Sequence, residues 1–215
     1  PLGMHHPLGR ADGLLALERD GDFDWVVLGS TGAGRVANFL LGSTAERVVR
    51  EAHTPVLAVP PDRAPEPKWK RILVPTDFSS DSRAAMERAV ELARDHDAVL
   101  DVLHAFSWPS SGLTLLDMKA TPESMDPFEK QRWNEFEAFL GDFDLEGIHV
   151  AENLRLGGAY TAVESHLEGE DIDLICMGTR GRSGLERMVL GSVTAKVLRT
   201  MPCEVLAVRG PEADE

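Results

Sequence analysis

The amino-acid sequence predicts an open parallel α/β sheet of five strands with helices on both faces, preceded by a partial copy of the same fold. Two observations support this fold class. Short apolar segments alternate with segments of helical periodicity, which favours parallel strands joined by right-handed crossovers. In addition, residues 24–59 align without a gap with residues 173–208, and twelve of the 36 aligned positions are identical. The chain therefore contains a repeated strand–helix–strand unit.

The repeat keeps the residues that shape turns in register. The matched pairs are Gly29 and Gly178, Gly32 and Gly181, Gly42 and Gly191, and Ser43 and Ser192. Two unrelated units would rarely share all four pairs, so we interpret the pattern as a tandem duplication. A weaker match extends upstream, where residues 11–20 and 160–169 each predict a short helix before the strand.

The two copies differ in length. Residues 1–62 contain only the C-terminal half of the unit, whereas residues 71–210 contain a complete one. Between them, residues 63–70 follow two prolines and carry further prolines and charges, which is typical of a linker. We therefore expect a partial domain, a linker and a complete domain.

The complete copy begins with a buried strand and a helix. Residues 71–77 (RILVPTD) are apolar up to Pro-Thr-Asp, as in a strand buried on both faces. Ser79, Ser80 or Asp81 can cap the helix that follows. Its expected apolar stripe consists of Ala85, Ala89, Val90 and Ala93.

The remaining elements alternate in the same way. Residues 99–106 and 148–156 predict the second and third strands. Between them, residues 108–127 predict a long loop and residues 128–140 an amphipathic helix. The aromatic residues of that helix, Trp133, Phe136 and Phe139, are expected in the core or at an interface.

Composition and charge exclude several functions. Lysine and arginine number 22 against 36 acidic residues, and the net charge of −14 repels nucleic acids and anionic membranes. No apolar run approaches the ~20 residues of a membrane helix. Cys176 and Cys203 have no metal-binding spacing, and two thiols in apolar segments suit a reducing cytoplasm.

A spaced glycine pattern follows the strand at residues 174–177. It reads Gly178-x-x-Gly181, nine residues, then Gly191-Ser192, and a helix is expected from about residue 193. Glycines let backbone amides approach an anion, and a helix N-terminus adds free N–H groups and a favourable dipole. The pattern is neither a Walker A loop, since Gly-Lys-Ser/Thr is missing, nor the dinucleotide fingerprint. A tight turn without a ligand remains the alternative.

The glycine pattern together with Pro-Thr-Asp resembles the nucleotide-binding branch of the universal stress protein family, in a tandem form whose first repeat is incomplete. The resemblance covers residues 68–209 fully and about 5–60 partly. It implies a fold like that of the adenine nucleotide alpha hydrolases and binding of ATP, ADP or AMP, with Mg²⁺ alongside. It also implies a cytoplasmic stress-response sensor or switch, with at most slow ATP hydrolysis.

The resemblance assigns roles residue by residue. It places Asp77 at the ribose or adenine, Ala105 at the adenine, and the glycine segments at the phosphates. The full set of expected ATP-binding residues is Pro75, Thr76, Asp77, Ala105, Met177, Gly178, Arg180, Gly181, Gly191, Ser192, Val193 and Thr194. Arg180 and Arg182 would add positive charge beside the phosphates. The first copy lacks Pro-Thr-Asp and has Ala45 opposite Thr194, so we expect no nucleotide site there.

Two other classes of function remain. One is a nucleotide-independent interaction module of the same family. The other is an ATP-hydrolysing or adenylating enzyme of a related fold, which would need a Ser-Gly-Gly-x-Asp-Ser type of loop that the chain lacks after its first complete strand. No catalytic or metal-binding set is identified. His104 is interpreted as a core histidine, and His166 has no recognisable partner in the sequence.

The incomplete copy predicts a partner. Residues 25–28 would lack the neighbouring strand that a complete unit provides, and an open apolar edge tends to pair. We therefore expect a homodimer formed through the incomplete half. Members of the family dimerise through their last strand, so residues 56–59 and 205–208 are also candidates for the same pairing within one chain.

Overall fold

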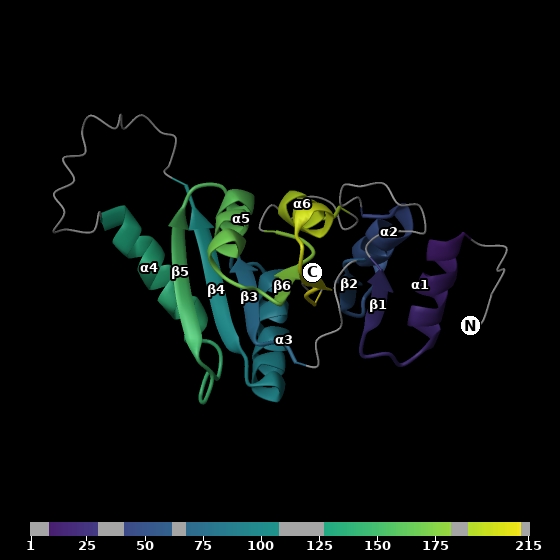
Figure 1. Ribbon diagram of the computed structural model, residues 1–215, viewed down its shortest axis with the longest axis horizontal. Coiled ribbons are helices and arrows are strands. Elements are labelled where there is room, and N and C mark those ends of the chain that lie inside the picture. Colours follow the sequence, from purple (N-terminus) through teal and green to yellow (C-terminus); the bar gives the residue numbers. More distant parts are fainter. Residues whose placement is uncertain (1–8, 30–40, 62–67, 108–126, 182–188, 212–215) are drawn as a thin grey trace.

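The structure is a computed structural model that describes residues 9–29, 41–61, 68–107, 127–181 and 189–211. These residues form one seven-stranded sheet with the order β1-β2-β7-β6-β3-β4-β5, covered by helices on both faces (Figure 1). No helix in these five segments is long and apolar enough to cross a membrane.

The helices and strands alternate along the chain. The helices are α1 (Arg10–Asp20), α2 (Ser43–Glu51), α3 (Ser80–His96), α4 (Pro127–Leu140), α5 (Ala159–Gly169) and α6 (Ser192–Thr200). The strands are β1 (Val26–Gly29), β2 (Val56–Val59), β3 (Arg71–Thr76), β4 (Val99–Phe106), β5 (Val150–Leu156), β6 (Leu174–Gly178) and β7 (Glu204–Val208). The loop predicted at residues 108–127 lies almost wholly outside the described residues.

Five strands form the parallel sheet that the sequence predicts. Strands β7, β6, β3, β4 and β5 pair in parallel, with Ile72 opposite Leu100 and Leu174 as one register point. The third predicted strand begins at Val150 because the Ile148 amide bonds the Leu145 carbonyl in a preceding turn. All five carboxyl ends meet at one edge, where open α/β sheets bind their ligands.

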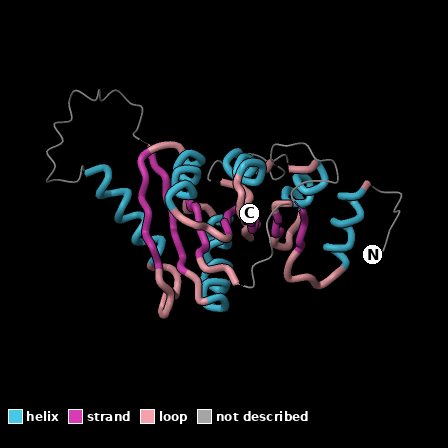
Figure 2. Tube along the Cα trace, in the orientation of Figure 1, coloured by secondary structure: helices cyan, strands magenta, loops and turns pink. Residues whose placement is uncertain are grey.

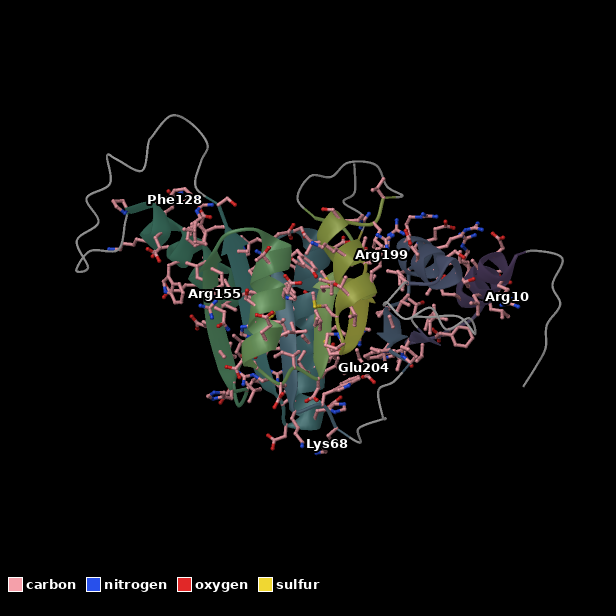
Figure 3. The ribbon with its side chains drawn as sticks, turned by 45° about the horizontal axis from the view of Figure 1, so that its top comes forward. Arg10, Lys68, Phe128, Arg155, Arg199 and Glu204 are labelled. Atoms are coloured by element: carbon pink, nitrogen blue, oxygen red, sulfur yellow. The ribbon has the colours of Figure 1, made fainter. Side chains whose placement is uncertain are left out.

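The partial copy extends the same sheet in the opposite direction. Strand β2 pairs antiparallel with β7, with Val56 opposite Ala207, which confirms the predicted pairing within one chain. Strand β1 pairs with β2 and forms the outer edge (Figure 2). The Arg199 guanidinium of α6 bridges to Glu46 of α2 at 2.8 Å and so ties the two copies together. Figure 3 shows Arg199 on the side of α6 that faces the partial copy.

Each face of the sheet has its own helices and apolar core. Helices α1, α2, α5 and α6 pack on one face, where Val48, Val163 and Val197 belong to a common buried cluster. Helices α3 and α4 pack on the other face, which buries Met86 and Phe136 completely. Trp133 is only partly buried at the margin of this second core.

Helix α3 begins and ends at residues suited to each position. The Ser79 hydroxyl accepts a hydrogen bond from the Ser82 amide at 3.3 Å, so Ser79 is the N-cap among the three candidates. At the other end Asp97 takes the left-handed conformation, with φ of 56°. The predicted alanine stripe is buried against β3 and β6, which lets the helix axis approach the sheet closely.

A buried ion cluster lies under the C-terminal part of α5. The Asp101 side chain is fully buried on β4 and lies 2.5 Å from Arg71 Nε and 3.3 Å from His166 Nε2. Arg71 also pairs with Glu170. Burial raises the pKa of Asp101, but its hydrogen bonds to His166 and Arg71 outweigh that effect and hold the pKa below its ordinary value.

We predict that Asp101→Asn lowers the free energy of unfolding at pH 7 by about 2 kcal/mol, because a hydrogen-bonded charge is lost from a buried site. Since the folded-state pKa is depressed, this stabilisation is complete above the ordinary carboxyl pKa of 3.8 and disappears as the pH falls through the folded value. Urea unfolding at several pH values measures the difference. A gap between wild type and variant that stays constant down to acid pH would contradict the assignment, and exposed Asp144→Asn is the control.

Candidate functional site

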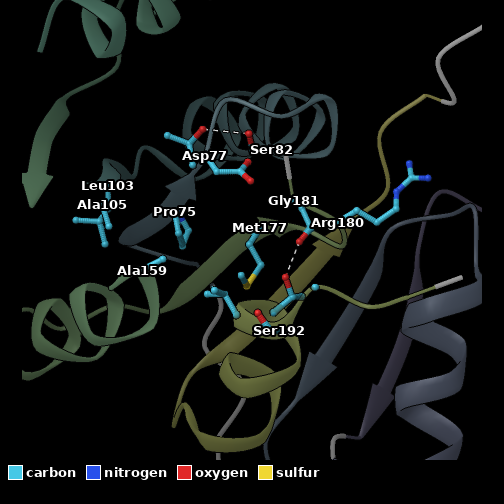
Figure 4. A pocket seen from close by; sticks show the side chains of 15 residues that line it. Pro75, Asp77, Ser82, Leu103, Ala105, Ala159, Met177, Arg180, Gly181 and Ser192 are labelled. Atoms are coloured by element: carbon cyan, nitrogen blue, oxygen red, sulfur yellow. Dashed lines mark hydrogen bonds between the residues drawn. The ribbon is translucent and has the colours of Figure 1, made fainter. Parts of the chain in front are cut away.

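A cavity of about 260 Å³ opens at the carboxyl edge of the parallel strands (Figure 4). It lies among the ends of β3, β4 and β6 and the first residues of α5 and α6. The lining includes all twelve residues expected from the sequence: Pro75, Thr76, Asp77, Ala105, Met177, Gly178, Arg180, Gly181, Gly191, Ser192, Val193 and Thr194. Ser82, Leu103 and Ala159 complete it. The geometry brings these residues together, and what they bind remains a prediction.

The turn after β3 places a carboxylate at the cavity. Asp77 Oδ1 accepts a hydrogen bond from the Ser79 amide at 3.1 Å, and Thr76 Oγ1 accepts one from the Phe78 amide at 3.1 Å. The Thr76 hydroxyl also donates to Ser82 Oγ at 3.1 Å, which links the turn to the first residues of α3. These bonds fix the direction in which the Asp77 side chain leaves the backbone.

Phe78 holds this turn in an uncommon conformation. Its φ is 65°, in the left-handed region that an aromatic residue rarely adopts. The ring compensates by stacking on His104 at 4.1 Å between centroids and by packing against Phe139. His104 is buried and bonds the Thr76 carbonyl through Nδ1 at 2.8 Å, as expected of a core histidine. Sequence reasoning missed Phe78, since no local pattern indicates its backbone conformation.

One part of the cavity is apolar. Pro75 of β3, Leu103 and Ala105 of β4 and Met177 of β6 line it. Residues alternate between the faces of a strand, so Leu103 and Ala105 point into the cavity while His104 points into the opposite core. This alternation could have identified Leu103 from Ala105 in the sequence. The small side chain at Ala105 leaves room beside the strand.

Two helices begin at the opposite part of the cavity. Helix α6 begins at Ser192 and α5 at Ala159, and neither N-terminus is capped by a side chain. The first amides of a helix have no partner within it, and the helix dipole makes this end positive. Two uncapped helix N-termini therefore lie beside one cavity. Ala159 was not selected from the sequence, although Gly157-Gly158 before it was a usable signal.

Some hydroxyl and amide groups of this region bond other parts of the protein, and others face the cavity. Thr194 Oγ1 donates to the Gly178 carbonyl at 2.8 Å, and the Gly191 amide donates to the Thr179 carbonyl at 2.8 Å. These bonds use groups that the sequence analysis had assigned to phosphates. In the part of the chain that the structure describes, this end of the cavity presents the Ser192 hydroxyl and the first amides of α6 as donors.

Arg180 lines the cavity through its backbone, while its charge is used elsewhere. Its Nη2 lies 2.8 Å from Asp81 Oδ1 and its Nε lies 3.0 Å from Asp81 Oδ2. The side chain extends away from Met177 and Ser192 (Figure 4). The positive charge expected beside the phosphates is therefore paired with Asp81 in this structure. Arg182, the other expected cation, lies outside the described residues.

The glycines permit close contacts that a side chain would block. A Cβ at Gly178 would lie 2.7 Å from Asp81 Cβ and 2.8 Å from the Asp81 carbonyl carbon, so α3 could not approach β6. A Cβ at Gly181 would lie 2.8 Å from Asp77 Oδ2, inside the cavity. Gly178 is thus required by the fold, whereas Gly181 keeps the space next to Asp77 free.

We predict that Thr194→Val lowers the free energy of unfolding by about 1–2 kcal/mol, because the buried bond to the Gly178 carbonyl is lost without a change in shape. Thr200→Val is the control, since its hydroxyl bonds the Lys196 carbonyl of the same helix and the Tyr160 hydroxyl at an exposed position. Chemical denaturation compares the two variants. Equal losses would show that the Thr194 bond has no special role in seating α6.

Comparison with known proteins places the chain in one family. The model of the universal stress protein family matches residues 10–60 and 68–209. A universal stress protein of Methanocaldococcus jannaschii is 30% identical over 158 residues, which cover 68% of this chain and 85% of that protein.

Solved structures of the same family share the fold. The crystal structure of a universal stress protein from Archaeoglobus fulgidus superposes with a TM-score of 0.68 at 24% identity. The match covers 93% of this chain and 66% of that one, so the chain spans about two thirds of its length. A universal stress protein crystallised in complex with cAMP matches 66% of this chain with a TM-score of 0.50 and 22% identity.

Proposed function

The chain belongs to the universal stress protein family, and we propose that it serves the stress response of that family by binding an adenine nucleotide, with ATP as the principal ligand. The binding site is the cavity at the carboxyl edge of the parallel strands. Occupation of the cavity would act as a sensor or switch in the cytoplasm. At most slow hydrolysis accompanies binding.

A single observation carries this proposal: one cavity combines an apolar wall, a carboxylate and two helix N-termini. The wall at Ala105 and Met177 suits the face of an adenine ring. The Asp77 carboxylate suits the hydroxyls of a ribose, and the amides at the start of α6 suit phosphate oxygens. These are the three chemistries that the base, the sugar and the phosphates of a nucleotide require.

The residues present fit a ligand of this class. Gly181 keeps the space beside Asp77 free, and Gly191 lets the start of α6 lie close to the segment after β6, since a Cβ there would lie 3.3 Å from the Thr179 carbonyl oxygen. Bound Mg²⁺ would neutralise part of the phosphate charge, which is useful in a protein of net charge −14. The relative crystallised with cAMP supports a nucleotide as the ligand and makes cyclic AMP a competitor to test.

The alternatives differ in what they require. A nucleotide-independent interaction module would leave the cavity unused, and an ATP-consuming enzyme would turn over faster than roughly 1 s⁻¹. Titration with ATP distinguishes the proposed function from the interaction module, which would not bind ATP. A phosphate-release assay distinguishes it from the enzyme, which would release phosphate at that faster rate. Parallel titrations with ADP, AMP and cyclic AMP rank the ligands.

We predict that wild type binds ATP in a calorimetric titration and that Gly181→Val abolishes the binding. The added side chain would collide with Asp77 Oδ2 and fill the space at the centre of the cavity. Gly169→Val is the matched control, because nothing lies within 4 Å of a Cβ at that position. Unimpaired binding by Gly181→Val, or no binding by wild type, would refute the proposed site.

A second copy of the chain is the partner that we propose. Strand β1 pairs with β2 and forms the sheet edge, and Val27 at its centre is 61% exposed. The matching residue of the complete copy, Cys176, is fully buried against α3. Two β1 edges related by a two-fold axis would pair antiparallel, which satisfies the open edge and brings apolar side chains of the second copy beside Val27.

We predict that wild type sediments as a dimer at micromolar concentration and that Val27→Lys sediments as a monomer, because a charged side chain blocks pairing of strand edges. Val189→Lys is the control, since Val189 is also an exposed apolar residue but belongs to the complete copy, just before α6. A monomeric wild type, or a Val27→Lys variant that remains dimeric, would count against this interface.

A further inference from the structure

Asp81 makes several hydrogen bonds to residues 178–181, which we call the glycine loop. Its position in the first turn of α3 does not require these bonds. Its side chain is buried at the start of α3, and the cap of that helix is Ser79. Oδ2 accepts bonds from the Thr179 hydroxyl at 2.8 Å and from the Arg180 amide at 3.0 Å. Both oxygens also bond the Arg180 guanidinium. One carboxylate therefore holds two consecutive residues of the loop.

These bonds connect Asp81 to the cavity through the backbone. Thr179 and Arg180 lie between Gly178 and Gly181, both of which line the cavity, whereas Asp81 does not. The Thr179 carbonyl in turn accepts the Gly191 amide, the N-cap of α6. A displacement of Thr179 would move both glycines and the first turn of α6 together.

The Arg180 guanidinium is better explained as the counter-ion of Asp81 than as a phosphate ligand. Its Nη2 also donates to the Gly210 carbonyl at 3.3 Å, which fixes the side chain on α3 and the segment after β7. Moving it to a ligand would leave the buried Asp81 carboxylate with less compensation, which is costly. The incomplete copy lacks α3 and has Thr31 at the position that matches Arg180.

We propose that Asp81 is a positioning residue that holds the glycine loop in the conformation that binds the phosphates. The Arg180 guanidinium is the counter-ion of Asp81 rather than a phosphate contact. This inference rests on the proposed nucleotide function. Phosphate recognition then depends on correctly placed amides and hydroxyls. The Asp81–Arg180 pair contributes to it indirectly, by keeping Thr179, Gly181 and α6 in register.

The test compares ATP with adenosine in calorimetric titrations of Asp81→Asn, Arg180→Met and the double variant. ATP affinity should fall about tenfold, the equivalent of ~1.4 kcal/mol, in each single variant. The double variant should lose no more than Asp81→Asn alone, because the contact between the Asp81 carboxylate and the Arg180 guanidinium is already disrupted in that variant. Adenosine affinity should stay within about threefold of wild type, which a general loss of stability would not predict.

Hydrogen exchange supplies a second measurement that needs no ligand. Exchange of the Arg180 amide should accelerate in Asp81→Asn, because that amide donates to Asp81 Oδ2. Asp142→Asn is the control for both measurements, since it removes an exposed partner of Arg83 elsewhere on α3. If Asp81→Asn does not fold, Arg180→Met tests the Asp81–Arg180 ion pair by removing the guanidinium instead of the carboxylate.

The outcomes separate this inference from the proposed function. If wild type binds neither ATP nor adenosine, but the Arg180 amide exchanges faster in Asp81→Asn, nucleotide binding is refuted. The role of Asp81 in holding the glycine loop is then retained. Unchanged exchange of the Arg180 amide in Asp81→Asn refutes the role of Asp81 in holding the glycine loop, whatever the protein binds. Loss of ATP affinity in Arg180→Met with ATP affinity retained in Asp81→Asn would make Arg180 a phosphate ligand and overturn the inference.

Discussion

Close contact between the first turn of α3 and the ends of β6 and β7 is the constraint on which the site depends. The contact needs glycine at the end of β6 and again just after β7: a Cβ at Gly178 would lie 2.8 Å from the Asp81 carbonyl carbon, and one at Gly210 would lie 2.7 Å from that of Ser80. Helix α3 follows the turn that carries Asp77. Seating the helix therefore brings that turn and the glycine loop to the same edge of the sheet.

The partial copy shows what the same unit becomes without this helix. It keeps the strand–helix–strand arrangement and continues the sheet through β2. It has no counterpart of β3 or α3, so Val27 is largely exposed where Cys176 is buried. Within the described residues, the cavity is formed by the complete copy. The partial copy adds two strands to the sheet, buries apolar surface and forms one edge of the sheet.

The sequence predicted the fold and twelve of the residues that line the cavity because both depend on local signals. Glycine spacing and Pro-Thr-Asp are short patterns, and each directly follows or ends an apolar segment typical of a buried strand. The pairings Asp81–Arg180 and Asp101–His166 join residues 99 and 65 positions apart, and no local pattern specifies such partners. The left-handed conformation of Phe78 likewise depends on an aromatic cluster that exists only in the folded chain.

The central claim is that amides at the start of α6 hold the phosphates of a nucleotide whose base lies against β4. A titration of ¹⁵N-labelled protein with ATP, followed by amide NMR, tests it most directly. The account predicts large shifts at Val193 and Thr194 with ATP, and much smaller ones there with adenosine, while Ala105 shifts with both. Shifts confined to other parts of the chain, or α6 amides that respond equally to adenosine, would contradict it.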